Sequence, residues 1–316
     1  MYLPGKLRYI SDTLRNRFHV MDEKNFYTSR ITDLVPENFD IRKSSDYLDS
    51  CEPELVFLGK DRYSLNQSQY ILSSGHLRRN TLVFLDSESS PLFYINHLGL
   101  KGKTVDPSDR LIIVWGDSIV FGIGLGWIHG KSKSGSIILN GGHEGTRPKI
   151  ILRNAIELNT KQSATLNIFS LGWHGAKNKH EVKEVLKGTL SLPSLALMTL
   201  PTSLQFKNVL SDFTKFFKSG NVNEGFVFWG NLRPTKLVLM KLLYNMSRQN
   251  RIIRNFAKKH DLPLFDLARI IKVNSGFAPD SCFFDLGHFR PSFYPVLNQL
   301  LIEFVNACET SSDSIT

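Results

Sequence analysis

Residues 111 to 126 read Leu-Ile-Ile-Val-Trp-Gly-Asp-Ser-Ile-Val-Phe-Gly-Ile-Gly-Leu-Gly, and the rest of the chain can be interpreted from this stretch. The first four residues are apolar and mostly β-branched, which is typical of a strand buried on both faces. The strand runs into Gly116-Asp117-Ser118. Glycine at a tight strand-to-helix turn makes room for a small hydroxyl side chain, and folds expose nucleophiles in this way. The stretch therefore predicts a buried strand followed by a turn that presents Ser118.

Three better-known motifs do not fit this stretch. The Gly-x-Ser-x-Gly elbow would place glycine at position 120, which is Val120. A P-loop ending in Gly130-Lys131-Ser132 would begin with glycine at position 125, which is Leu125. The nearby glycines lack Gly-x-Gly-x-x-Gly spacing because position 127 is Trp127. A phosphate cradle is therefore not indicated here.

A second chemical motif stands near the other end of the chain. Phe284-Asp285-Leu286-Gly287-His288 places a carboxylate three residues before an imidazole. Residues at this spacing lie side by side on one helical turn, so Asp285 can hold the ring of His288. A serine nucleophile needs such a base and such an orienting carboxylate. A capping aspartate followed by a surface histidine is the alternative interpretation.

With Gly-Asp-Ser after the first strand and Asp-x-x-His before the last helix, residues 106 to 308 resemble the SGNH (GDSL) hydrolase family. The resemblance implies a flavodoxin-like α/β fold, a three-layer α/β/α sandwich around a five-stranded, mostly parallel sheet. It also implies a triad of Ser118, His288 and Asp285 that works without cofactor or metal. The first expectation is an esterase for a small molecule or a glycan, with O-acetyl groups as one possible substrate. The alternatives are an O-acyltransferase on a polysaccharide and a non-catalytic module that binds an anionic polymer.

The resemblance also implies hydrogen-bond donors for an oxyanion, and the first is the backbone N–H of Ser118. The family's second motif places a glycine after the second strand. Residues 164 to 171 are the predicted second strand, and they run into Gly172-Trp173-His174-Gly175. Gly175, the later glycine, is therefore the expected second donor.

The third donor departs from the family pattern, which is Gly-x-Asn-Asp after the third strand. The one similar string is Trp229-Gly230-Asn231-Leu232, and it follows the predicted fourth strand, 225 to 229. The predicted third strand, 195 to 200, is followed instead by Thr202. Asn231 is preferred because an amide is a fixed donor, and Thr202 is the alternative.

Residues 1 to 105 are interpreted as an N-terminal addition of unknown role. Apolar residues recur at helical spacing between 7 and 18, which predicts a short amphipathic helix. Apolar runs at 55–58, 82–85 and 92–95 are separated by turn residues and predict β-hairpins.

In the remaining chain, strand patterns alternate with helix patterns, which predicts a parallel sheet covered on both faces. Ligands of such folds lie beyond the carboxyl ends of the strands, where Ser118, Gly175 and the Asp285 loop would meet. The glycine-rich residues 135 to 148 are predicted to be a loop, and 309 to 316 a flexible tail. The other predicted elements are a strand at 262–265 and helices at 180–186, from 234 onward and at 293–305.

Charge and composition suggest where the protein works and what it binds. The net charge is +10, and the cysteines Cys51, Cys282 and Cys308 are scattered along the chain. The sequence shows no signal or membrane-spanning pattern, so a cytoplasmic location is expected. Eight basic residues and no acidic one lie between Arg233 and Lys259. They form either a solvated helix face or a surface for an anionic polymer.

Isolated histidines and tryptophans complete the candidates. His129, His143 and His174 lie in predicted loops without a spaced metal-binding partner, so solvated side chains are expected. Trp173 and Trp229 end predicted strands and serve either the core or a substrate pocket.

Overall fold

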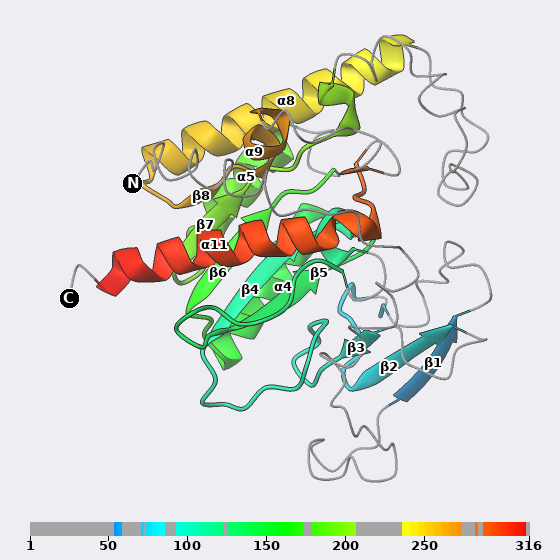
Figure 1. The fold of residues 1–316 in the computed structure, drawn as a ribbon, viewed down its shortest axis with the longest axis vertical. Helices are drawn as coiled ribbons and strands as arrows, with labels where there is room; N and C mark the ends of the chain where they lie inside the picture. The colour runs from blue at the N-terminus through cyan, green and yellow to red at the C-terminus, as the bar shows by residue number, and fades with distance from the viewer. Residues whose placement is uncertain are drawn as a thin grey trace.

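A five-stranded sheet in the order β5-β4-β6-β7-β8 forms the middle layer of the protein (Figure 1). All of its neighbouring pairs are parallel. In chain order the arrangement is 2-1-3-4-5, the flavodoxin-like order, so the predicted fold class is confirmed. The strands are β4 (Leu111–Gly116), β5 (Ile137–Gly142), β6 (Leu166–Ser170), β7 (Leu195–Met198) and β8 (Leu264–Phe265).

The structure is a computed structural model. It describes residues 54–58, 71–72, 74–85, 93–122, 126–173, 179–206, 236–273, 282–283 and 287–313. The predicted helix at 7–18 and the predicted strand at 225–229 lie outside the described residues.

Helices cover both faces of the sheet, as the alternation of elements predicts. Side chains of β4 alternate between two cores: Ile112 and Val114 enter one, while Ile113 and Trp115 enter the other. The first core is closed by α9 (Leu267–Val273) and α11 (Tyr294–Asp313), and Figure 1 shows α11 crossing in front of β4 and β6. The second is closed by α4 (Pro148–Lys161) and α5 (Lys179–Thr189), while α8 (Lys236–Lys259) contributes to both.

Strand β5 lies where the sequence predicts a loop, so that prediction is wrong. The two glycines at its end are required by close packing rather than by a turn. A side chain on Gly141 would meet the indole of Trp115, and one on Gly142 would meet the backbone of Phe121. Glycine inside a strand often marks such a close approach. The sheet therefore gains an edge strand directly after the Ser118 turn.

The N-terminal addition contains a second, three-stranded sheet in the order β1-β2-β3. Its strands are β1 (Glu54–Leu58), β2 (Thr81–Leu85) and β3 (Phe93–Ile95). Strands β2 and β3 pair antiparallel, as a hairpin requires. Strands β1 and β2 pair in parallel, so the hairpin prediction is wrong for that pair.

Residues 93 to 105 join this small sheet to the large one. Lys101 forms antiparallel bridges with Ile95 on one side and with Asn140 of β5 on the other. Leu100 and Val105 are buried in the same core as β4 and α4. The end of the N-terminal addition is thus packed into the α/β core.

The C-terminal residues correct a further prediction. Helix α11 continues to Asp313, whereas the sequence predicts a flexible tail from 309. Glu309 explains the difference, because its carboxylate accepts hydrogen bonds of 2.6 Å from the hydroxyls of Ser134 and Ser136. Residues 314 to 316 lie outside the described residues. Among the helices that the structure describes, none has both the length and the apolar character needed to cross a membrane.

Candidate active site

The nucleophile turn begins where β4 ends. All six residues of β4 are buried, and Ser118 is partly exposed directly after it. Gly116 has no room for a side chain, because a Cβ there would collide with Val120 on the following turn. The hydroxyl of Ser118 therefore stands at the carboxyl edge of the sheet, where ligands of such folds bind.

Asp117 fixes the start of this turn. Its buried carboxylate accepts the N–H of Ile119 at 3.2 Å, which caps the short helix α3 (Ser118–Phe121). Its other oxygen accepts the N–H of Trp173 at 2.5 Å, in the loop that follows β6. Gly172 leaves space for this carboxylate, since a Cβ at that position would overlap it. One side chain therefore ties together the loops after β4 and β6.

The structure brings Ser118 and His288 together from opposite ends of the domain. Ser118 Oγ lies 2.8 Å from His288 Nε2, although 170 residues separate them in the sequence. Both side chains are partly exposed. The distance is within hydrogen-bond range for a hydroxyl and an imidazole that can take its proton.

Aromatic packing holds the loop that carries His288. Phe283 and Phe289 form an antiparallel bridge, and their rings stack with centroids 5.2 Å apart. Phe289 also packs against Trp127 of the loop after α3, at 6.2 Å between ring centroids. A Cβ on Gly287 would overlap the indole of Trp173. Both chain neighbours of His288, Gly287 and Phe289, are therefore held by packing against aromatic side chains.

Several predicted site residues lie outside the described residues: Asp285, Gly175, Asn231, His174 and Trp229. Thr202, the alternative third donor, is described and buried. Its hydroxyl oxygen accepts the N–H of Leu204 and caps the 3₁₀ turn η4 (Ser203–Gln205). Thr202 therefore has a structural role after β7.

Strand β5 changes the strand count on which the donor predictions were based. Within the five-stranded sheet, β5 is the second strand in chain order. Strand β6 is therefore the third strand of this sheet, not the second as predicted. The loop after the second strand is then His143-Glu144-Gly145, and its glycine is exposed with a positive φ of 64°. The loop after the third strand begins with Gly172-Trp173-His174. By this count Gly145 stands where the family's second glycine is expected, and His174 stands where its asparagine is expected.

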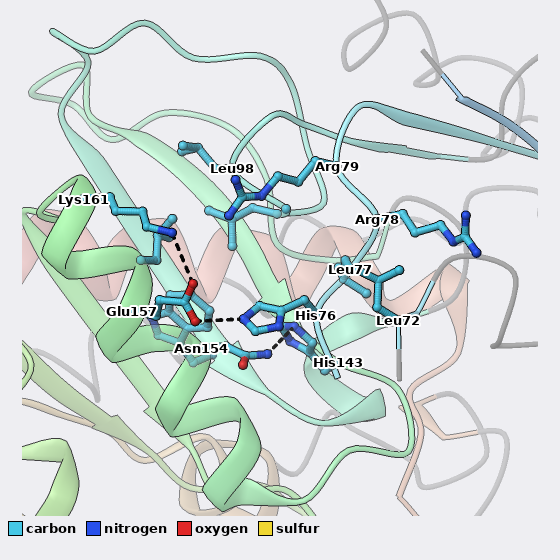
Figure 2. Close-up of a pocket in the computed structure, with 14 residues that line it drawn as sticks. Leu72, His76, Leu77, Arg78, Arg79, Leu98, His143, Asn154, Glu157 and Lys161 are labelled. Carbon is cyan, nitrogen blue, oxygen red and sulfur yellow. Dashed lines mark hydrogen bonds and ion pairs between the residues drawn. The ribbon is translucent and has the colours of Figure 1, made fainter. Parts of the chain in front are cut away.

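A cavity of about 440 Å³ lies away from this site, between the N-terminal addition and α4 (Figure 2). Glu157 stands on one side of it, and His76 and Lys161 each approach the Glu157 carboxylate to 3.2 Å. Neither Ser118 nor His288 lines the cavity. It is therefore distinct from the serine–histidine pair.

His143, predicted as a loop histidine, is a buried part of the structure. Its Nδ1 lies 2.8 Å from the carbonyl of Gly141, and its Nε2 lies 3.3 Å from the amide nitrogen of Asn154. Burial lowers the pKa of His143 to about 4, so the ring is neutral at pH 7. Within the described residues, no group of three or more His, Cys, Asp or Glu side chains is arranged to hold a metal ion.

The basic segment falls on α8 from residue 236 onward. Arg254 is used structurally, with two hydrogen bonds of 2.8 Å to Asp266 after β8. Arg248 lies over the ring of Tyr244, 5.6 Å from its centroid. Among the residues of this helix from 240 to 259, the exposed basic ones are Lys241, Arg251, Lys258 and Lys259.

Comparison with known proteins gives no match to a family model and none to a curated protein. Solved structures are similar at low identity. A lipase/acylhydrolase from Enterococcus faecalis is 17% identical over 63% of this chain and 96% of its own, with a TM-score of 0.40. A GDSL-like lipase from Bacteroides thetaiotaomicron is 13% identical over 66% and 91%, with a TM-score of 0.39.

A catalytic mutant of an acetylxylan esterase from Geobacillus stearothermophilus is also similar. It is 13% identical over 64% of this chain and 95% of its own, with a TM-score of 0.40. Identities this low say nothing of activity, so function has to be argued from the residues of the site.

Proposed function

We propose that the protein is a serine esterase in which Ser118 is the nucleophile. The observation that carries the proposal is the 2.8 Å contact between Ser118 Oγ and His288 Nε2 at the carboxyl edge of the sheet. A serine hydroxyl is a weak nucleophile until an adjacent base takes its proton, and a neutral imidazole can do so at neutral pH. Asp285, three residues before His288, is proposed as the carboxylate that orients the ring.

The reaction follows from these roles. Ser118 Oγ attacks the ester carbonyl while its proton passes to His288 Nε2. The tetrahedral intermediate collapses, the proton passes from His288 to the leaving alkoxide, and an acyl-serine remains. Water then repeats the sequence with His288 as its base, which releases the carboxylic acid and restores the serine.

The oxyanion of each intermediate needs donors, and the loops around Ser118 supply candidates. The N–H of Ser118 is the first, since it begins α3 and has no intrahelical acceptor. Gly145 and His174 are proposed as the other two, because they follow the second and third strands in chain order. The sequence-based candidates Gly175 and Asn231 are the alternatives to be compared with them.

The proposed substrate is an ester with a small acyl group. The motif resemblance makes an O-acetyl ester on a glycan the first natural substrate to test. Among model compounds, an aryl acetate is suitable because its phenolate leaves easily and absorbs light.

The test combines covalent labelling with turnover. A fluorophosphonate should label the wild type on Ser118, and the protein should hydrolyse an aryl acetate. Ser118→Ala should abolish labelling and nearly all turnover while thermal stability stays close to that of the wild type, because a partly exposed hydroxyl contributes little packing. Ser191→Ala, at an exposed serine beyond α5, is the matched control and should behave as wild type.

Two outcomes would count against the proposal. One is a wild type that neither reacts with the probe nor hydrolyses the ester. The other is a Ser118→Ala variant that keeps more than about a tenth of the wild-type turnover, since loss of a nucleophile costs orders of magnitude more.

A further inference from the structure

The helix that carries Ser118 is a single turn, and its carbonyl groups depend on partners from elsewhere. The last C=O groups of any helix lack intrahelical donors, and α3 is hardly longer than this unsatisfied end. The carbonyl of Ser118 accepts the N–H of Gly122 at 2.9 Å. The next three carbonyl groups accept hydrogen bonds from side chains.

Three side chains from three different segments make these bonds. Trp127 Nε1 donates to the carbonyl of Ile119 at 2.9 Å. Asn140 Nδ2, from β5, donates to the carbonyls of Val120 and Phe121 at 3.0 and 3.1 Å. Lys101 Nζ donates to the carbonyl of Phe121 at 2.5 Å, and it lies 3.5 Å from that of Gly122. The position of the nucleophile turn is therefore set by these donors.

Lys101 is the donor that comes from the N-terminal addition. Its main chain pairs with that of Asn140 in both directions, at 2.9 and 3.2 Å, which brings the side chain under α3. The residue is only 2% exposed, and Nζ lies 3.9 Å from the ring centroid of Phe121 and 5.0 Å from that of Phe93. Two aromatic rings and two carbonyl groups thus surround the amine.

Burial of the Lys101 amine destabilises its charged form. Desolvation lowers the pKa of Lys101 to about 7, while Glu144 acts in the opposite direction. A methionine of similar length would fill the space between two phenylalanine rings without this cost. The amine is therefore explained by its hydrogen bonds to the carbonyls of Phe121 and Gly122 rather than by packing.

We propose that Lys101 is a positioning residue for Ser118: it fixes the carbonyl end of α3 and so keeps the serine hydroxyl within hydrogen-bond distance of His288. The inference rests on the proposed esterase function. Under this proposal the end of the N-terminal addition contributes to the reaction, because Lys101 binds a carbonyl of the helical turn that presents Ser118.

The test is Lys101→Met in the full chain, with fluorophosphonate labelling and aryl acetate turnover as readouts. The melting temperature should stay the same or rise, because a buried amine is replaced by an apolar side chain. Labelling should still reach one probe per molecule. The rate constant for labelling and kcat should each fall about tenfold or more, with KM little changed, because a small misplacement of a nucleophile lowers its reaction rate strongly. Lys103→Met is the matched control, because Lys103 is half-buried and the charges that act on its amine are those of Lys131, Asp106 and Asp109.

A structural role would give a different pattern. It would lower the melting temperature and the fraction of molecules that label, and leave the rate per labelled site as in the wild type. That pattern overturns the proposal, and so does a Lys101→Met variant with wild-type kcat. If the methionine variant does not fold, the same comparison is made with Lys101→Gln, which keeps a shorter neutral donor. Failure of the wild type to label would instead refute the esterase function itself.

The effect of pH gives an independent check on the buried amine. Because the pKa of Lys101 falls from 10.5 to about 7 on folding, the wild type is destabilised by this group below pH 7 and regains that stability as the pH rises towards 10.5. The melting temperature of Lys101→Met relative to the wild type should therefore be highest near pH 7 and below, and should fall at alkaline pH. A gain that does not depend on pH would show that the amine is not buried as described.

Discussion

His143 is a single buried side chain that makes the stability of the protein depend on pH. Its pKa is about 4 in the folded protein and 6.5 as an ordinary histidine. The folded state resists protonation, so stability is complete above pH 6.5 and is lost as the pH falls towards 4. The loss should approach about 3 kcal/mol.

Chemical denaturation of the wild type at pH 7 and pH 4 measures this loss. His143→Gln should be less stable at pH 7, but its stability should change less between the two pH values. His180→Gln, at an exposed histidine on α5, is the control and should keep the wild-type dependence. An equal pH dependence in the His143 variant would refute the assignment.

Among single residues, the sequence predicts those that belong to a catalytic motif. It does not predict those whose role depends on contacts made in the folded structure. Ser118 and His288 are predictable because each stands in a short motif with a known role, and the structure places them in contact. Asp117 and Lys101 are not predictable in the same way. Their roles depend on Trp173 and Phe121, which come near only when separate segments fold together.

Among the elements, the loops after the second and third strands of the large sheet are the proposed source of two oxyanion donors. If His174 takes the place of the family's asparagine, His174→Ala should lower kcat about 10²-fold with KM little changed. Asn231→Ala should then have a small effect. Aryl acetate kinetics of the two variants measure the difference, and the opposite result would restore the prediction made from the sequence.

Strand β5 shows why its sequence alone does not predict a strand. Its sequence, Ile-Ile-Leu-Asn-Gly-Gly, is a short apolar run followed by residues that ordinarily mark a turn. Here Asn140 binds the carbonyls of α3, and the two glycines admit Trp115 and Phe121. Tertiary contacts thus override local turn preference. Strands β4, β6 and β7 are predicted within a few residues.

For the whole molecule, the exposed basic residues of α8 form either a solvated helix face or a surface for an anionic polymer. If they bind a polymer, binding to heparin should weaken as salt rises, because counterions compete for the same charges. Replacing Arg251 and Lys258 by glutamine should weaken binding more than replacing Lys183 and Lys187 on α5, which removes the same charge elsewhere. Equal effects would indicate a response to net charge alone, and turnover of a neutral aryl acetate should hardly change with salt.

The bridge between Lys101 and Asn140 also bears on aggregation. β5 is an edge strand with an apolar sequence, and an unpaired edge of this kind can recruit strands from other molecules. Three of its outer backbone groups already have partners: Ile138 N–H bonds to the carbonyl of Gly130, and the N–H and C=O of Asn140 pair with Lys101. Lys131, the bridge partner of Ile137, is exposed, and an exposed lysine discourages strand addition. A chain that begins at residue 106 would uncover half of this edge, so it should self-associate where the full chain stays monodisperse in light scattering.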